Sequence, residues 1–311
     1  MIDGVIVVNK EKGFTSHDVV AKLRGILKQK KIGHTGTLDP DATGVLPVCL
    51  GKATKLCDMF TEKDKVYRAV MLLGVETDTQ DISGKVINET ENPYPDRDVI
   101  VNTVKSFEGD YMQVPPMYSA IKVNGKKLYE LAREGIEIDR KPRKVTIYSI
   151  SDIETDGKRV SMTVQCSKGT YIRTLCHDIG QKLGVGACME SLERTKVGRF
   201  LLEDALKLSE IEELINKDAE KFMGKIISVT DIFADRPAFV TKAQYDKLLE
   251  NGNAITVQCL NLDTKTVDNQ ILSESELADL TDMRAYRSDG KFVGIYRYCL
   301  EKRIIKCEKM F

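Results

Sequence analysis

Apolar residues recur along this chain at two spacings, one typical of strands and one typical of helices. The run over residues 2–8 is apolar and β-branched, which predicts a buried strand. Val19, Leu23, Ile26 and Leu27 then recur at helical spacing, and Thr15 or Ser16 just before them can cap a helix. The chain therefore opens with a strand followed by an amphipathic helix.

Strands and helices alternate irregularly over the next 200 residues. The turn dipeptides Asn124-Gly125 and Asp156-Gly157 predict hairpins, whereas residues 33–51, rich in Gly, Thr and Pro, are expected to be mostly irregular. Strands are expected at residues 66–73, 118–123, 144–154 and 159–166, and helices at residues 96–107, 126–134, 171–183 and 203–225. An order without a regular βα repeat favours an α+β fold over a doubly wound one.

A domain boundary is expected near Asp235-Arg236-Pro237, because the pattern changes there to short strand candidates. One of these pairs flanks the turn dipeptide Asp289-Gly290. The sequence thus predicts a large domain over residues 1–235 and a small β-rich domain over residues 236–311, of the size of an accessory module.

Charge gives no general argument for a nucleic-acid partner, because 47 basic residues balance 47 acidic ones. A basic helix face is present, and both a solvated surface and RNA contact remain open for it: Lys22, Arg24, Lys28, Lys30 and Lys31. No apolar run approaches the ~20 residues that span a bilayer, and no secretory signal is visible at Met1, so a cytoplasmic protein is expected. Eight cysteines without Cys-x-x-Cys spacing indicate reduced thiols.

The segment over residues 33–48 holds the most specific candidate chemistry. Its three glycines allow unusual backbone angles or close approach of another chain segment. Asp39 precedes Pro40, which biases the Asp39 backbone toward extended angles and presents its carboxylate from a stiff position. From these residues alone, an Asx-type turn in which Asp39 bonds its own backbone is the alternative.

The same segment contains Gly36-Thr37-Leu38-Asp39-Pro40, Ala42-Thr43-Gly44 and Leu46-Pro47. This long pattern resembles the catalytic motif of the bacterial TruB-type tRNA pseudouridine-55 synthases. Other stretches of the family match in the same order along residues 1–235: Asn9-Lys10, Asp64-Lys65-Val66-Tyr67, Thr77-Asp78-Thr79, Val114-Pro115-Pro116-Met117-Tyr118-Ser119-Ala120, Gly125-Lys126-Lys127-Leu128-Tyr129, Ser167-Lys168-Gly169-Thr170-Tyr171-Ile172-Arg173 and Leu192-Glu193-Arg194-Thr195. The resemblance implies a mixed, mainly antiparallel sheet flanked by helices, with a small PUA-like C-terminal domain.

The resemblance also implies roles for single residues. It makes Asp39 the nucleophile and Arg173 the guanidinium that keeps Asp39 ionised and in place. It places Tyr67 against the target base, also as a candidate proton acceptor, with Tyr171 as an orienting hydrogen-bond partner and Leu192 as an apolar wall. Taken singly, Tyr67 and Leu192 would be core residues, and Arg173 would belong to a surface ion pair.

RNA contacts are expected outside this pocket. The resemblance puts His34 in the gap left by a uridine flipped out of its loop. Basic residues in or beside the matched motifs are the candidates for phosphate contact: Lys10, Lys122, Lys126, Lys127 and Arg143. The expected partner is the T-arm of tRNA, without a metal, an organic cofactor or a guide RNA, and the expected state is a monomer. A secondary tRNA-folding role is compatible with this function.

Three other interpretations remain. A non-catalytic RNA-binding protein on the same scaffold would be favoured if Asp39, Tyr67 or Arg173 were replaced, and all three are present. A glycoside or nucleoside hydrolase would need Asp39 and Asp41 to flank a bond, and carboxylates two residues apart are poorly placed for that. The guide-RNA-dependent relatives resemble the chain around Asp39, but the short C-terminal region favours the stand-alone enzyme.

Overall fold

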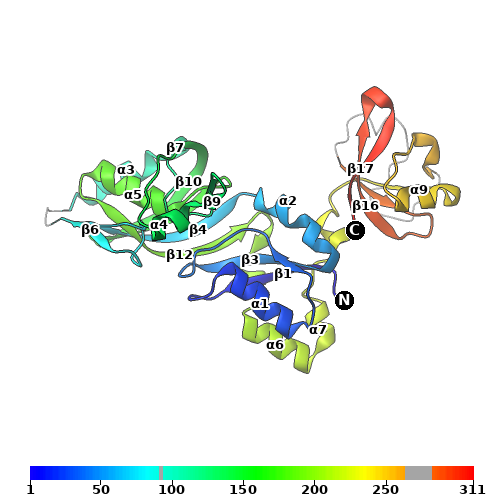
Figure 1. Ribbon diagram of the computed structural model, residues 1–311, viewed down its shortest axis with the longest axis horizontal. Coiled ribbons are helices and arrows are strands. Elements are labelled where there is room, and N and C mark those ends of the chain that lie inside the picture. The colour runs from blue at the N-terminus through cyan, green and yellow to red at the C-terminus, as the bar shows by residue number, and fades with distance from the viewer. Residues whose placement is uncertain (91–93, 263–281) are drawn as a thin grey trace.

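The computed structural model describes residues 1–90, 94–262 and 282–311, and within them one large sheet organises most of the chain (Figure 1). Neighbouring strands of this sheet are antiparallel except β3 and β12, which are parallel. In spatial order they are β1 (Gly4–Lys10), β3 (Thr43–Leu50), β12 (Ala187–Val197), β4 (Lys65–Leu73), β11 (Arg159–Cys166), β10 (Arg143–Thr155) and β7 (Gly109–Gln113), while β2 (Ile32–His34) pairs with β3 and β13 (Phe200–Leu201) with β12. The predicted mixed, mainly antiparallel α+β sheet is confirmed.

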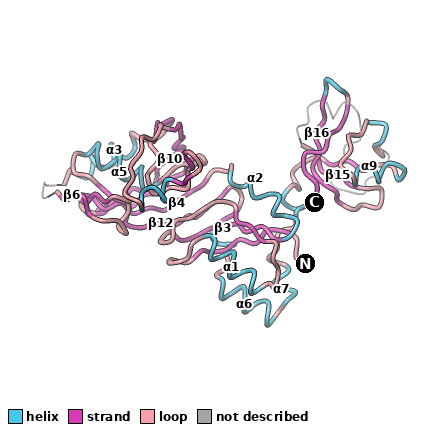
Figure 2. Tube along the Cα trace, in the orientation of Figure 1, coloured by secondary structure: helices cyan, strands magenta, loops and turns pink. Residues whose placement is uncertain are grey.

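Helices cover the two ends of this sheet (Figure 2). At one end lie α1 (Ser16–Ile26), α6 (Leu208–Lys217) and α7 (Ala219–Met223), and at the other α3 (Arg97–Lys105) and α5 (Ile172–Leu183). Helix α1 begins as predicted, because Thr15 and Asp18 cap it reciprocally, and it buries Val19, Val20 and Leu23 against β1 and β3. Further short helices are α2 (Cys57–Thr61), α4 (Leu128–Arg133) and α8 (Val229–Ile232).

The structure confirms the turn predicted at Asn124-Gly125 but not the structure predicted for residues 33–51. Asn124 and Gly125 both have positive φ, 50° and 87°, as the tight turn between β8 (Lys122–Val123) and β9 (Lys126–Lys127) requires. A second small hairpin joins β5 (Val75–Thr77) and β6 (Val86–Glu89). The expectation of a mostly irregular segment over residues 33–51 is wrong, because the eight residues of β3 and the last two residues of β2 place more than half of this segment in the sheet.

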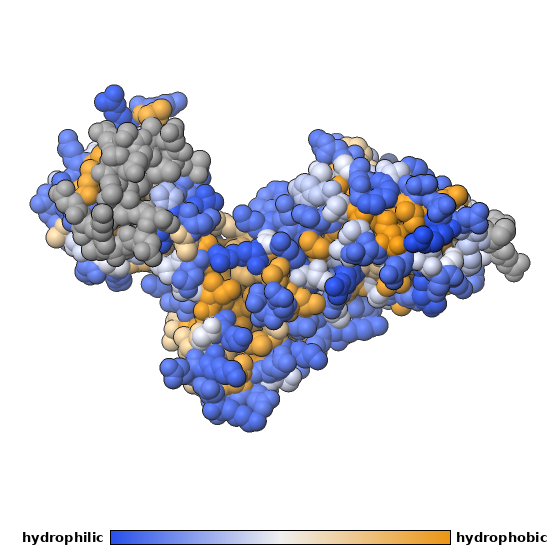
Figure 3. Space-filling view, turned by 180° about the vertical axis from the view of Figure 1, so that it is seen from behind, coloured by the Kyte–Doolittle hydropathy of each residue, from blue (hydrophilic) through white to orange (hydrophobic). Residues whose placement is uncertain are grey.

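A separate four-stranded sheet follows residue 237. It contains β14 (Ala238–Val240), β15 (Met283–Tyr286), β16 (Phe292–Cys299) and β17 (Ile304–Met310), with α9 (Asp246–Glu250) beside it. Two hydrogen bonds join β17 to the short 3-10 helix Gly51–Leu56 that follows β3. Lys55 Nζ donates to the Met310 carbonyl (2.8 Å), and Lys309 Nζ donates to the Lys55 carbonyl (2.6 Å). Seen from behind, apolar surface gathers beside this C-terminal sheet and toward the far end of the large sheet (Figure 3).

Candidate active site

The loop that carries Asp39 joins β2 to β3 and is held from both sides. The Leu38 side chain is buried, and its backbone N–H donates to the Ser16 hydroxyl at 3.0 Å. The Gly13 N–H donates to the Pro40 carbonyl at 2.9 Å. The residues on either side of Asp39 are therefore anchored to α1 and to the segment before α1. Together with the extended bias that Pro40 imposes, these anchors present the Asp39 carboxylate from a stiff backbone.

Lys10 lies beneath this loop. Its ammonium group donates to the carbonyls of Glu11 (3.1 Å), Phe14 (2.6 Å) and Pro40 (3.0 Å), and the residue has no exposed surface. Burial lowers the pKa of Lys10 to about 8, although Asp39 opposes that change. All three ammonium donors are therefore engaged by backbone carbonyls, two on the segment that follows β1 and one on the Asp39 loop, so the predicted contact of Lys10 with an RNA phosphate finds no free donor on this side chain.

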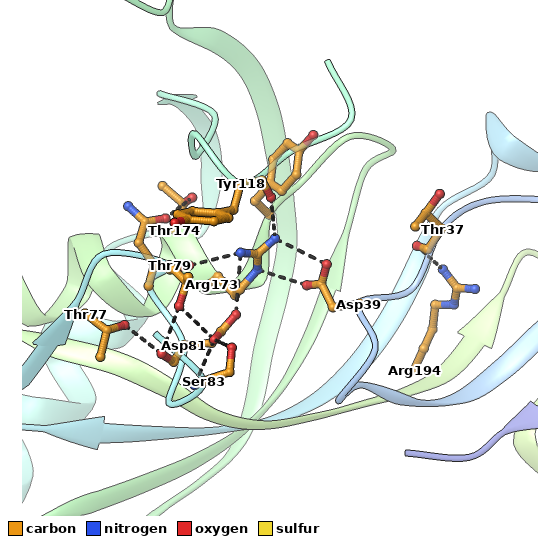
Figure 4. A network of polar contacts seen from close by, with 12 residues as sticks. Thr37, Asp39, Thr77, Thr79, Asp81, Ser83, Tyr118, Arg173, Thr174 and Arg194 are labelled. Atoms are coloured by element: carbon orange, nitrogen blue, oxygen red, sulfur yellow. Dashed lines mark hydrogen bonds and ion pairs between the residues drawn. The ribbon is translucent and has the colours of Figure 1, made fainter. Parts of the chain in front are cut away.

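Arg173, in the first turn of α5, meets Asp39 through two contacts although the residues are 134 positions apart. Arg173 Nε lies 2.9 Å from Asp39 Oδ2, and Arg173 Nη2 donates to Asp39 Oδ1 at 3.2 Å (Figure 4). The remaining donors reach the carbonyls of Thr79 (2.9 Å) and Tyr118 (3.0 Å). With only 6% of its side chain exposed, Arg173 has a fixed orientation, and so does the carboxylate that it holds.

Asp81 is a second carboxylate at this guanidinium, and the sequence analysis missed it. Asp81 Oδ2 lies 3.5 Å from Arg173 Nη1, while its Oδ1 accepts hydrogen bonds from the Thr79 hydroxyl (2.9 Å) and the Ser83 N–H (3.0 Å). The loop between β5 and β6 supplies all of these residues (Figure 4). The available indication was the matched stretch Thr77-Asp78-Thr79, which ends two residues before Asp81.

These neighbours set the ionisation of Asp39. Burial raises the pKa of the Asp39 carboxyl, Arg173 opposes the rise, and the negative charge of Asp81 adds to it. The Asp39 side chain nevertheless keeps 39% of its surface exposed, so solvent or a substrate can reach it. The net effect is a pKa above the usual value for aspartate.

Tyr67 and Leu192 lie in the same buried cluster as Leu38 and Ile172, the residues that precede Asp39 and Arg173. The four chain segments of the predicted site therefore converge on one core. Burial raises the pKa of the Tyr67 phenol, so Tyr67 is neutral at physiological pH. The register of β4 and β12 places Tyr67 opposite Arg194 and Leu192 opposite Ala69.

Arg194 is a further buried cation near Asp39, and the sequence did not single it out as a site residue. It donates from Nε to the Val45 carbonyl at 2.8 Å and from Nη1 to the Thr37 carbonyl at 3.5 Å. Gly44 permits this packing, because its φ is +102° and an added Cβ would lie 2.2 Å from the Arg194 carbonyl oxygen. Arg194 thus fastens both ends of the Asp39 loop to β12.

Tyr171 precedes α5 and is fixed through its backbone. Its N–H donates to Gln113 Oε1 at 2.8 Å, and Gln113 Nε2 donates to its carbonyl at 3.0 Å. Burial raises the pKa of the Tyr171 phenol, against the effects of Ser119, Arg173 and Arg143. Tyr171 thus has a fixed backbone two residues before Arg173, whose guanidinium holds Asp39.

His34 ends β2 and contacts a second imidazole. Its ring centroid is 5.0 Å from that of His17 in an edge-on arrangement, and its Nδ1 accepts a hydrogen bond from the Gly36 N–H at 3.4 Å. Burial, and then the charge of His17, lower the pKa of His34. His34 is therefore a flat neutral ring on the segment that leads to Asp39.

The remaining predicted RNA contacts lie on or near one hairpin. Lys122 and Lys127 face each other across β8 and β9, and Lys126 pairs with Glu134 at 3.3 Å on the exposed surface. Arg143 begins β10 opposite Gln113, the residue that holds Tyr171. The basic face of α1 is exposed as well, so both interpretations of it stay open.

No group of three or more His, Cys, Asp or Glu side chains in residues 1–90, 94–262 and 282–311 is arranged to hold a metal ion. Over the same ranges, every helix is too short or too polar to cross a bilayer. All eight cysteines are free thiols.

Comparison with known proteins identifies the family of this chain. Residues 24–172 match the family model "TruB family pseudouridylate synthase (N terminal domain)", and residues 173–232 match "tRNA pseudouridylate synthase B C-terminal domain". Proteins named tRNA pseudouridine synthase B are similar over almost the whole chain. The one from Lachnoclostridium phytofermentans is 50% identical and covers 100% of both chains, and one from Clostridium perfringens is 45% identical over 98% of this chain and 100% of its own.

Solved structures are similar in fold as well. A chain of a Cbf5-Nop10-Gar1 complex superposes with a TM-score of 0.70 at 28% identity, covering 99% of this chain and 84% of that one. A chain of an H/ACA RNP bound to a substrate RNA containing 2'-deoxyuridine gives 0.69 at 26% identity with the same coverage. On the family models and the full-length relatives together, the chain belongs to the TruB family of pseudouridylate synthases.

Proposed function

We propose that this chain converts a uridine of tRNA to pseudouridine, at position 55 in the T-loop, with the carboxylate of Asp39 as the nucleophile. The two-point contact between Asp39 and Arg173 carries the proposal, because it aims the carboxylate and favours its charged form while leaving the side chain 39% exposed. The full-length relatives named tRNA pseudouridine synthase B support tRNA as the substrate.

The chemistry needs one positioned carboxylate and no change of oxidation state. The bond from uracil N1 to the ribose C1' breaks, the base turns over, and C5 forms the new bond to C1'. The proton lost from C5 is balanced by one gained at N1, so the product has the mass of the substrate. Attack on the ribose, attack on the uracil ring and elimination to a glycal each use ionised Asp39, and all three stay open.

We assign the surrounding side chains to the base. Tyr67 offers a flat ring that can stack on uracil and a phenol that can exchange a proton with it, while Leu192 supplies an apolar wall in the same cluster. Tyr171 is the orienting hydrogen-bond partner. Because burial keeps both phenols protonated, each can donate to a uracil carbonyl.

RNA binding follows from shape and from phosphate contacts. A uridine inside a folded loop is stacked, so it must be flipped out, and the neutral ring of His34 suits the space it leaves. The exposed hairpin with Lys122, Lys126 and Lys127, together with Arg143, is assigned to phosphates of the T-arm.

We also propose that residues 1–235 form the catalytic domain and residues 236–311 a PUA-like RNA-binding domain, and that the protein acts as a cytoplasmic monomer without a guide RNA. A tRNA-folding role would use the same RNA surface.

The proposal is tested with unmodified tRNA transcript. The wild-type chain should form pseudouridine at position 55, detected by mapping the modified position. Asp39→Asn should abolish turnover while the dissociation constant for tRNA changes less than about threefold, because the amide keeps the shape but loses the charge. Turnover by Asp39→Asn would remove the nucleophile assignment. Binding without turnover by the wild type would favour a non-catalytic RNA-binding protein, and release of free uracil would indicate a hydrolase.

A further inference from the structure

A turn beside Arg173 has a backbone conformation that side chains rarely adopt. Gln80 has a φ of 65°, in the left-handed region where glycine, asparagine and aspartate are the usual residues. The residues on either side of it both contact Arg173 Nη1: the Thr79 carbonyl accepts a hydrogen bond from it at 2.9 Å, and Asp81 Oδ2 lies 3.5 Å away. Residues 79–81, here called the Gln80 turn, thus bring two acceptors to one nitrogen.

Backbone hydrogen bonds attach the Gln80 turn to β12. The Gln80 carbonyl accepts from the Met189 N–H at 3.0 Å, and the Ile82 N–H donates to the Met189 carbonyl at 3.0 Å. The Gln80 N–H also donates to the Thr77 carbonyl at 3.1 Å. A strained backbone persists where its surroundings enforce it, and such strain clusters at functional sites. These three bonds hold the turn to the sheet and to its own loop, but none of them reaches α5, the helix that carries Arg173.

The Thr174 hydroxyl joins the Gln80 turn to α5. It donates to Gln80 Oε1 at 2.7 Å, and Thr174 is only 2% exposed, so water does not compete for the bond. Thr174 directly follows Arg173 in the first turn of α5, and Figure 4 shows Thr174, Thr79 and Asp81 around the Arg173 side chain. Two consecutive helix residues therefore bind three consecutive residues of the turn. The mechanism above uses neither Thr174 nor Gln80.

We propose that Thr174 is a positioning residue: its hydroxyl keeps the Gln80 turn on Arg173 and so fixes the guanidinium that aims Asp39 at uridine. Arg173 Nε and Nη2 face the Asp39 carboxylate, whereas the third nitrogen, Nη1, takes its contacts from the turn. An arginine side chain rotates about several bonds, and a guanidinium that is also held at Nη1 cannot tilt away from the carboxylate. This inference rests on the proposed function.

Two substitutions at Thr174 test the role of its hydroxyl. Thr174→Val removes the donor but keeps the shape of the side chain, and Thr174→Ser restores the donor. Single-turnover formation of pseudouridine on unmodified tRNA transcript, at saturating enzyme and across pH, compares both with the wild type. We expect Thr174→Val to lower the plateau rate constant about tenfold with the dissociation constant for tRNA within about twofold, because a misaimed nucleophile slows reaction rather than binding. Thr174→Ser should stay within about threefold of the wild type, because it keeps the hydrogen bond.

The pH profile separates positioning from a loss of stability. Asp81 raises the pKa of Asp39, so an Asp81 carboxylate released from the guanidinium raises it less. The ionised form of Asp39 then persists to lower pH, and the acidic limb of the rate in Thr174→Val should move to lower pH. Thr241→Val is the matched control, because the Thr241 hydroxyl makes the same kind of bond, to Asp246 Oδ1 at 2.7 Å, and the residue has no exposed surface with which to touch RNA. This control should lower the urea midpoint by a similar amount and leave the plateau rate and the acidic limb as in the wild type.

Gln80→Gly is the second variant, because glycine adopts a positive φ without strain, so the change keeps the turn and removes the acceptor. It should reproduce the slower plateau and the shifted limb, and Thr174→Val should add almost nothing to it, since both changes break the same bond. An unmoved acidic limb in Thr174→Val, or effects of the two changes that add, would overturn the positioning role alone. Absence of pseudouridine with the wild-type chain would instead overturn the proposed function and, with it, this inference.

Discussion

Replacing Arg173 with lysine isolates the geometry of the guanidinium from its charge. Arg173 gives Asp39 two contacts, at 2.9 and 3.2 Å, and gives two more to the carbonyls of Thr79 and Tyr118. An ammonium group is a point charge without a planar fork, so it cannot hold both carboxylate oxygens and both carbonyls at once.

The expected fall in kcat follows from the loss of one hydrogen bond between residue 173 and the Asp39 carboxylate. A hydrogen bond to a charged group contributes about 1.5–3 kcal/mol. Because 39% of the Asp39 side chain is exposed, solvent screening favours the lower part of that range, about 1.5–2 kcal/mol. At about 1.4 kcal/mol for each factor of ten, kcat for Arg173→Lys should fall roughly 10- to 30-fold.

The pH profile gives an independent measure of the same change. Arg173 opposes the rise in the pKa of Asp39 that burial causes. A lysine that opposes it less leaves a higher Asp39 pKa, so the ionised form is lost sooner as the pH falls. The acidic limb of kcat should therefore move to higher pH in Arg173→Lys.

Single-turnover formation of pseudouridine on unmodified tRNA, measured across pH, is the assay, with thermal melting to establish folding. Arg159→Lys is the matched control: Arg159 also makes two contacts to one carboxylate, that of Glu190, at 3.0 and 2.8 Å, but its side chain is 52% exposed. The kcat of this control variant should stay within about twofold of the wild-type value. A kcat for Arg173→Lys within that same range, with an unshifted acidic limb, would refute the argument.

Three other changes test neighbouring parts of the structure. Asp81→Asn removes a charge that raises the pKa of Asp39, so the acidic limb of kcat/KM should move to lower pH; no shift, or one to higher pH, would contradict the network. Gly44→Ala should lower the free energy of unfolding in urea by about 3 kcal/mol, because the methyl group meets the Arg194 backbone, whereas Gly157→Ala, also at positive φ but in open space, should cost about 1–2 kcal/mol. Glutamine at all three hairpin lysines should weaken tRNA binding about tenfold and reduce the slope of log affinity against log salt by about 2, while the same change at Lys217, Lys221 and Lys225 should leave both nearly unchanged.

The sequence alone determined the elements whose stabilising contacts are local. Helix α1 follows from a capping pair three residues apart and an apolar stripe at helical spacing. The hairpin at Asn124-Gly125 follows from two residues that tolerate positive φ. The resemblance in Gly36–Pro40 identified the family correctly, because that motif is long and contiguous.

The segment over residues 43–50 shows where local chemistry stops being informative. Gly44 and Pro47 are typical of loops, yet β3 lies between β1 and β12. Its glycine is needed because the Arg194 backbone passes close by, and the Pro47 carbonyl accepts the Thr35 N–H at 3.2 Å. Partners far away in sequence decided that this segment is a strand.

The charges around Asp39 were likewise decided by the tertiary structure. The sequence provided Asp39 and Arg173, but it could not show that Asp81 shares the same guanidinium or that Lys10 is buried under the loop. Helix caps and tight turns depend on atoms a few residues apart, so their chemistry can be seen in the chain itself. The pKa of a buried carboxylate depends on which distant groups the packed sheet brings within a few ångströms, and only the folded chain sets that arrangement.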